Sequence, residues 1–172
     1  MATHRIPILS WNTLPDTTGR AFFEPYTNKA TNDIFNHLVL TLNDPGASQN
    51  HGVYSAFDIP VNYVTSPVIR VYWSSTAITG TCLFAFDYRA IGGDDTESLD
   101  QATFQEQVDI SDVAASATDE RLNVTGALTA GNFAAGDLVE FFFYRDGTTG
   151  APTDTLAAAV TVHGLYFEYS DV

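Results

Sequence analysis

The chain has 172 residues and a mass of 18.7 kDa, with 7 basic and 21 acidic residues and a formal net charge of −14. This length suits one domain, or one domain with an arm, and it can bury a core without disulfides or metals. At 45% hydrophobic and 13% aromatic residues, the chain is too apolar to be disordered. No apolar run reaches the ~20 residues of a membrane span. The acidity also disfavours direct contact with nucleic acid or with anionic membranes.

Residues 1–30 combine frequent prolines with large apolar side chains set among polar ones. Proline disfavours a central strand, yet this much apolar surface is not normally left in water. We therefore expect an extended N-terminal arm over residues 1–30, laid over its own domain or over a neighbouring subunit. A first strand followed by a loop is the alternative. The expected contact residues of the arm are Ile8, Trp11, Phe22, Phe23 and Tyr26.

The pattern of residues 31–172 predicts short strands separated by clusters of Gly, Pro, Asp, Asn, Ser and Thr. Runs rich in Val, Ile, Phe, Tyr and Thr mark each strand. The predicted strands are Ile34–Leu42, Val53–Ile59, Val68–Ser74, Leu83–Arg89, Gln105–Ile110, Leu122–Thr125, Leu138–Arg145 and Ala159–Tyr169.

Two of these runs are especially informative about burial. In Leu83–Arg89 the aromatic residues Phe84, Phe86 and Tyr88 alternate with the others, which predicts an inward-facing aromatic side. Leu138–Arg145 is apolar on both faces apart from Glu140 and Arg145, which predicts a central strand covered on both sides.

About eight strands with mixed connection lengths predict an all-β fold: a two-sheet antiparallel β-sandwich of jelly-roll type over residues 31–172. The Cys-Trp-Cys spacing of immunoglobulin domains is absent, since Cys82 is the lone cysteine. Asp112–Leu122 is expected to form a loop or a short helix between strands.

Signatures of catalysis are missing from the sequence. It contains no Gly-x-Ser-x-Gly elbow, no glycine-rich phosphate loop and no His-Glu-x-x-His motif. Glu140 and Glu168 lie in the two strongest strands and would serve glycoside hydrolysis only if they met across a sheet. Solvent exposure or pairing with Arg89 and Arg145 is the simpler expectation. We therefore predict no enzymatic activity.

An acidic loop after the fourth predicted strand offers the oxygen ligands that calcium prefers. Its candidate ligands are Asp94, Asp95, Glu97 and Asp100. Residues 146–150 with Asp154 form a second candidate, but neither segment has the spacing of a twelve-residue calcium loop. Ordinary solvated loops are the alternative, and no other cofactor is expected.

A carbohydrate-binding module is a serious alternative, because such sandwiches use exposed aromatic rings as platforms for sugars. Aromatic residues at strand positions more often belong to the core. The candidate platform residues are Trp11, Tyr26, Tyr54, Tyr63, Tyr72 and Trp73.

A set of ordered motifs between residues 68 and 170 resembles the jelly-roll virion structural proteins of tailed bacteriophages and prophages. The motifs are Phe86–Ile91, Ala135–Leu138, Arg145–Thr148, Asp154–Ala158 and Gly164–Tyr169. The resemblance implies a non-enzymatic particle component, most simply a capsid decoration or cement protein on the outer surface of a phage head. It also implies a homotrimer whose partners are the major capsid protein or other virion proteins.

Other features agree with this interpretation. We see no secretory signal in the first residues, which suits synthesis in the host cytoplasm followed by assembly. Strong acidity suits an outer position away from packaged DNA. The alternatives are a tail-fibre or receptor-binding domain that binds host glycans, or a free carbohydrate-binding module or glycan-active enzyme.

Overall fold

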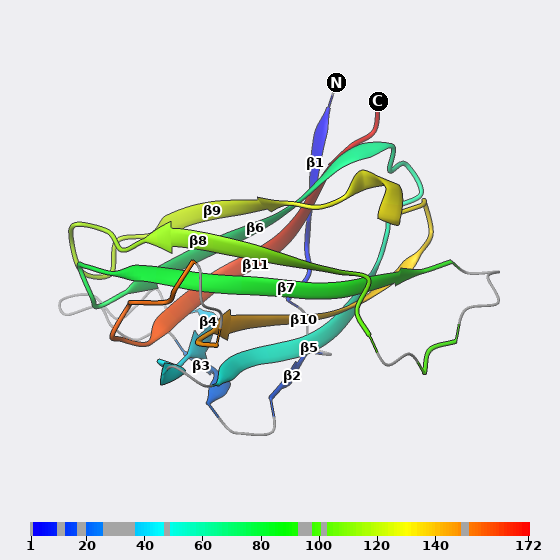
Figure 1. Cartoon of the computed structure of the whole chain (residues 1–172). Coiled ribbons are helices and arrows are strands. Elements are labelled where there is room, and N and C mark those ends of the chain that lie inside the picture. Colours follow the sequence, from blue (N-terminus) through cyan, green and yellow to red (C-terminus); the bar gives the residue numbers. More distant parts are fainter. Residues whose placement is uncertain are drawn as a thin grey trace.

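The computed structural model describes residues 2–9, 13–16, 20–25, 37–46, 49–92, 98–100, 103–148 and 152–172. It shows a jelly-roll β-sandwich of two antiparallel sheets, which confirms the predicted fold class (Figure 1). No α-helix occurs in this described part; a 3-10 turn, η2 (Ala130–Asn132), precedes one strand. Accordingly, no described helix is long and apolar enough to cross a membrane.

The six-stranded sheet has the order β3-β4-β11-β6-β9, and β1 pairs with β11 beside this path. Its strands are β1 (Thr3–Pro7), β3 (Ala21–Pro25), β4 (Leu38–Leu42), β6 (Thr65–Ser75), β9 (Leu122–Ala127) and β11 (Val160–Ser170). The five-stranded sheet has the order β2-β5-β10-β7-β8. Its strands are β2 (Leu14–Pro15), β5 (Asn50–Asp58), β7 (Thr81–Ile91), β8 (Glu106–Val113) and β10 (Leu138–Asp146).

The core between the sheets is rich in aromatic rings. The predicted inward side of β7 is confirmed, since Phe84, Phe86 and Tyr88 are all buried. Phe84 stacks on Phe143 of β10, with ring centroids 5.6 Å apart, and meets Trp73 of β6 edge to face. Each large ring removes about 150–250 Å² of surface from water, so this layer dominates the apolar burial that holds the sheets together.

Each of the eight predicted strands corresponds to an observed one, from β4 to β11. The prediction that β10 is central is confirmed, because it lies between β5 and β7. The expected cover on both sides is only partly found, since Glu140 and Phe142 on its outer face are half-buried and line a surface hollow. Asp112 and Val113 extend β8, and residues 114–121 form turns and bends without a helix.

Residues 1–30 contain three strands, where we predicted an extended arm or, as the alternative, a single first strand followed by a loop. Each of them ends at a proline: β1 at Pro7, β2 at Pro15 and β3 at Pro25. Strands β2 and β3 close the outer ends of their sheets, where a missing backbone donor costs no ladder bond. The described parts of the N-terminal segment are therefore extended and pair with their own domain.

Candidate functional site

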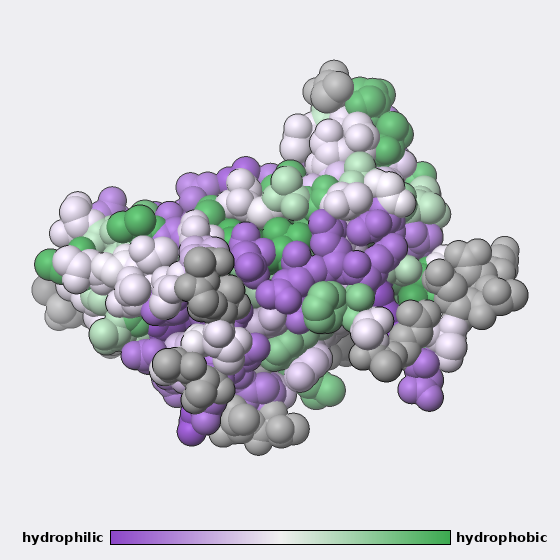
Figure 2. All heavy atoms as spheres, in the orientation of Figure 1, coloured by the Kyte–Doolittle hydropathy of each residue, from purple (hydrophilic) through white to green (hydrophobic). Residues whose placement is uncertain are grey.

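The outer face of the five-stranded sheet carries a hollow of about 630 Å³. It lies where Tyr54 of β5, Phe142 of β10 and Asp87 of β7 stand in one cross-strand row. Ala56, Glu140 and Arg89 form the next row. This sheet faces the reader in Figure 1, and Figure 2 shows hydrophobic and strongly hydrophilic atoms side by side across it. We call this site the aromatic hollow. The lining residues that matter below are Leu14, Tyr54, Asp87, Arg89, Phe104, Glu140 and Phe142.

Aromatic and aliphatic side chains form the walls of the aromatic hollow. Tyr54 stacks on Phe142 with centroids 4.2 Å apart, and Phe142 stacks on Tyr144 at 4.5 Å. Tyr54 is 51% exposed, so about half of its side chain is open to solvent, between Phe142 of β10 and its other cross-strand neighbour, Leu14 of β2. Leu14 and Phe104 are exposed on either side at 68% and 50%. Apolar walls of this kind are typical of small-molecule sites.

The floor of the aromatic hollow is charged. Arg89 Nε donates to Glu140 Oε2 at 2.7 Å, and Arg89 Nη2 donates to the backbone carbonyl of Leu99. Arg89 Nη1 is buried without a hydrogen-bond partner among the described residues, which is rare for a guanidinium donor. The floor therefore places a fixed ion pair, whose more exposed member is Glu140, beside the apolar side chains.

Asp87 is the most perturbed acid of this face. Burial raises the pKa of Asp87 to about 6, and the hydrogen bond from Tyr144 Oη opposes that rise. The charges of Asp109 and Asp146 raise it further. A carboxyl with a shifted pKa inside a hollow is a common mark of a functional site.

The raised pKa of Asp87 predicts a pH-dependent stability term. The folded state holds the Asp87 proton more tightly than the unfolded state. The contribution of Asp87 to the free energy of unfolding is therefore favourable at low pH and is lost as pH rises from about 4 to about 6. We expect Asp87→Asn to become more stabilising, relative to wild type, across that window, measured as urea unfolding at several pH values. Tyr144→Phe removes the opposing hydrogen bond and should move the midpoint upward. A wild-type minus Asp87→Asn difference that is flat with pH would contradict this.

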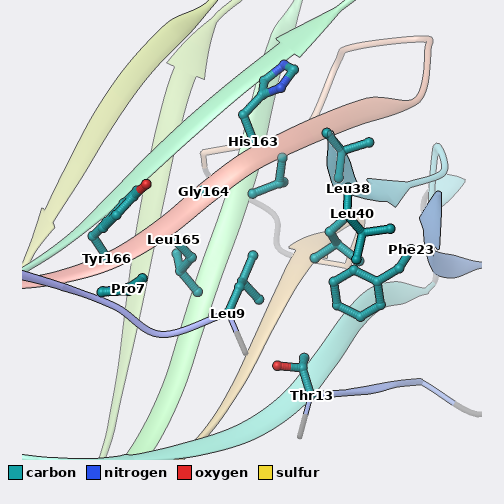
Figure 3. Close-up of a pocket in the computed structure, with 12 residues that line it drawn as sticks. Pro7, Leu9, Thr13, Phe23, Leu38, Leu40, His163, Gly164, Leu165 and Tyr166 are labelled. Carbon is teal, nitrogen blue, oxygen red and sulfur yellow. The ribbon is translucent and has the colours of Figure 1, made fainter. Parts of the chain in front are cut away.

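A second hollow of about 450 Å³ lies at the edge of the six-stranded sheet, in the gap that β1 and β4 leave along β11. Figure 3 shows Leu9, Leu40 and Phe23 gathered there, with the His163 ring projecting away from them. His163 is the extra residue of a β-bulge, and its ring lies 2.9 Å from Ser74 Oγ. The lining is mainly aliphatic and offers few hydrogen-bonding groups.

The predicted arm contacts fall into three groups. Ile8 is buried in the core of its own domain, and its N–H donates to the carbonyl of Leu165 at 2.9 Å. Phe22 and Phe23 lie in β3 and are partly buried. Trp11 and Tyr26 lie outside the described residues. The interface role of these five residues stays a prediction, as do the trimer and the virion partners that the resemblance implies.

The calcium candidates are only partly visible. Asp94, Asp95 and Glu97 lie outside the described residues, and Asp100 is exposed. Asp154, from the second candidate segment, instead pairs with Arg145 at 2.7 Å. Within the described ranges, no group of three or more His, Cys, Asp or Glu side chains is arranged to hold a metal.

The two glutamates considered for hydrolysis do not meet. Glu140 lies on the five-stranded sheet and pairs with Arg89 as expected. Glu168 lies on the six-stranded sheet, where it pairs with Arg70 and Arg5 rather than Arg145. The idea of a paired carboxylate site from these residues is therefore wrong.

The described candidates for a sugar platform divide into buried core residues and surface residues. Trp73 and Tyr63 are buried, whereas Tyr54 is exposed in the aromatic hollow and Tyr72 lies on the outer face of the other sheet. Sequence reasoning missed Phe142 and Asp87. The signal was present in the alternation of β10 and β7, which turns these two residues away from the core.

The sequence matches no protein-family model and no curated protein. Among solved structures, the fold is similar to a β-1,3-glucan-binding CBM6 from Bacillus halodurans, with a TM-score of 0.50, 11% identity, and coverage of 97% of this chain and 96% of that one. It is also similar to the arabinose-bound α-L-arabinofuranosidase MgGH51, with a TM-score of 0.52, 10% identity and 95% of this chain covered. This chain spans 24% of that enzyme's length. A domain of tailspike protein 4 from bacteriophage CBA120 matches at a TM-score of 0.45 and 11% identity, over 91% of this chain and 19% of that one.

Identities this low establish the class of fold alone, which is the jelly-roll β-sandwich. The chemistry of the site therefore has to come from the residues of this chain.

Proposed function

We propose that this protein is a carbohydrate-binding module that holds a neutral glycan in the aromatic hollow and does not cleave it. The observation that carries the proposal is the half-exposed ring of Tyr54 beside the fixed Arg89–Glu140 pair and Asp87. A pyranose ring needs this combination, because its C–H face is apolar and its rim is a ring of hydroxyl groups. Aromatic surface covers the first, and charged hydrogen-bonding groups satisfy the second.

The charge of the site supports a neutral ligand. Among the described residues that line the hollow, there are two acids, Asp87 and Glu140, and one base, Arg89. Asp109 of β8 lies on the same face. An acidic sugar entering this hollow would meet net negative charge in a chain that is already strongly acidic. Neutral β-glucan, xylan, galactan and arabinan oligomers are therefore the ligands to test first.

The contacts of the two acids in the hollow support binding rather than turnover. Glu140 accepts a hydrogen bond from Arg89 and Asp87 accepts one from Tyr144, so a neighbour orients each acid while its remaining lone pairs can accept from sugar hydroxyls. A tail-fibre or receptor-binding module would use the same surface on a host glycan, so the proposal does not depend on where the protein resides.

Truncating the exposed ring tests the proposal. We expect Tyr54→Ala to weaken binding of the best neutral oligosaccharide by about tenfold or more, because central aromatic contacts dominate binding energy. Isothermal titration calorimetry against the four neutral oligomers measures this. Tyr54→Phe keeps the ring and should retain most of the affinity.

Ile78→Ala is the matched control, since Ile78 is 52% exposed and lies outside the hollow, in the loop between β6 and β7. It should bind as wild type does. Equal affinity of wild type and Tyr54→Ala would overturn the site, and release of shorter sugars by the purified protein would overturn binding without cleavage.

A further inference from the structure

The outer face of the six-stranded sheet gathers basic side chains that are scarce elsewhere in this chain. Only 7 residues are Lys or Arg. Three of them lie together here: Arg5 of β1, Arg70 of β6 and Arg121 directly before β9. They surround Tyr72 of β6 and Tyr166 of β11. We call these five residues the arginine patch.

The arginine patch is one connected cluster. The Arg5 guanidinium carbon lies 5.6 Å from the centroid of the Tyr72 ring and 5.5 Å from that of Tyr166, and Arg5 Nη1 donates to Tyr72 Oη at 2.8 Å. On the other side of the patch, the guanidinium carbon of Arg121 lies 4.2 Å from the Tyr72 centroid. The two tyrosines meet edge to face at 5.6 Å. Arg5, in β1, and Arg121, directly before β9, thus approach the same ring from distant parts of the chain.

One acid, Glu168, lies within this cluster and already has its partners. Arg70 Nε and Nη2 donate to its two oxygens at 2.7 and 3.0 Å, and Arg5 Nε donates to Oε1. Burial would raise the pKa of Glu168, but the hydrogen bond and charge of Arg70, with those of Arg5, hold it below its usual value. Glu168 is therefore ionised and neutralises one of the three guanidinium groups.

Arg121 is the one arginine of the patch that has no contact with Glu168. Its side chain is exposed and forms no ion pair with any residue in the described part of the chain. Arg121 therefore presents a positive charge beside the Tyr72 ring, with exposed Asp119 and Glu120 directly before it in a chain whose formal charge is −14. Guanidinium groups bind carboxylate and sulfate groups through paired hydrogen bonds, as Arg70 does with Glu168.

We infer that the arginine patch is a second binding site, which takes an anionic sugar residue carrying a carboxylate or a sulfate. The guanidinium groups bind the charged substituent, and the tyrosine rings provide apolar surface for the sugar body. A densely charged polyanion such as nucleic acid would be repelled by the rest of the protein. The arginine patch lies on the other sheet from the aromatic hollow. Its ability to bind an anionic sugar can therefore be tested independently of the neutral-glycan proposal.

Calorimetry of the full chain in a Tyr54→Ala background, which removes the neutral site, tests the inference. The probes are a galacturonate tetramer, a sulfated galactose tetramer and an unsubstituted galactose tetramer at low salt. We expect at least one charged tetramer to bind and the neutral one not to bind. Whichever charged tetramer binds identifies the substituent. Added salt should weaken the binding, because exposed charges are screened.

Adding Arg121→Gln should weaken the charged ligand by about tenfold or more. Arg20→Gln is the charge-matched control, because exposed Arg20 precedes β3 at the opposite edge of the same sheet, and it should stay within about twofold. The inference is overturned if neither charged tetramer binds, if the neutral tetramer binds equally well, or if Arg121→Gln leaves the affinity unchanged.

Discussion

Arg145→Met is expected to destabilise the protein by about 3–5 kcal/mol, the largest effect of any single charged side chain in the described structure. Arg145 is fully buried in β10, and its Nε and Nη2 bind both oxygens of Asp154 at 2.7 and 2.8 Å. It also donates to the backbone carbonyls of Leu156 and Ala158. Removing the guanidinium leaves the Asp154 carboxylate buried without its counter-charge.

Urea unfolding of Arg145→Met measures this loss. The exposed Arg121→Met is the control and should cost less than about 1 kcal/mol. The double variant Arg145→Met/Asp154→Asn should recover part of the lost stability, because the unpaired charge is then gone. A loss below about 1 kcal/mol in Arg145→Met would show that the pair does not hold residues 154–158 against β10.

Trp73→Ala should cost about 3–5 kcal/mol, because it empties the largest fully buried side chain of the core. The indole lies between the sheets: its ring meets Phe84 edge to face at 5.7 Å, and its Nε1 donates to Asp112 Oδ2 at 2.9 Å. The variant therefore loses apolar contact from one sheet to the other and a hydrogen bond to β8. Chemical unfolding, read by circular dichroism, reports the change.

Trp73→Phe separates the two contributions, since it keeps an aromatic ring but loses the N–H donor. It should lose clearly less stability than Trp73→Ala. Equal losses in the two variants would mean that the hydrogen bond to Asp112, rather than the ring, holds the two sheets together here.

The sequence was sufficient for the sandwich because its strands alternate strongly. In β7 the period-two pattern of Phe84, Phe86 and Tyr88 gives both the strand and its buried face. The strands of residues 1–30 are different. Strand β1 pairs Thr3 with Ser170 at the far end of the chain, and a local sequence pattern does not predict such a long-range pairing. Its proline, like those of β2 and β3, indicated edge positions but not partners.

The candidate sites were harder to predict, since they depend on which strands are neighbours. Tyr54 was one of several aromatic candidates, and alternation alone does not distinguish it from Tyr63 or Trp73, which are buried. Asp87 and Arg89 come from β7, whereas Phe142 and Glu140 come from β10, and only the sheet order places them side by side. The same holds for Arg5, whose contact with Tyr72 crosses β11.

The central claim is that the outer face of the five-stranded sheet binds a neutral glycan. Titrating the isotopically labelled protein with the neutral oligosaccharide panel, and following backbone amide signals by nuclear magnetic resonance, tests it most directly. We expect the largest shifts at Tyr54, Ala56, Asp87 and Phe142, which line the aromatic hollow. Shifts confined to the six-stranded sheet, or no shifts with any oligosaccharide of the panel, would contradict the claim.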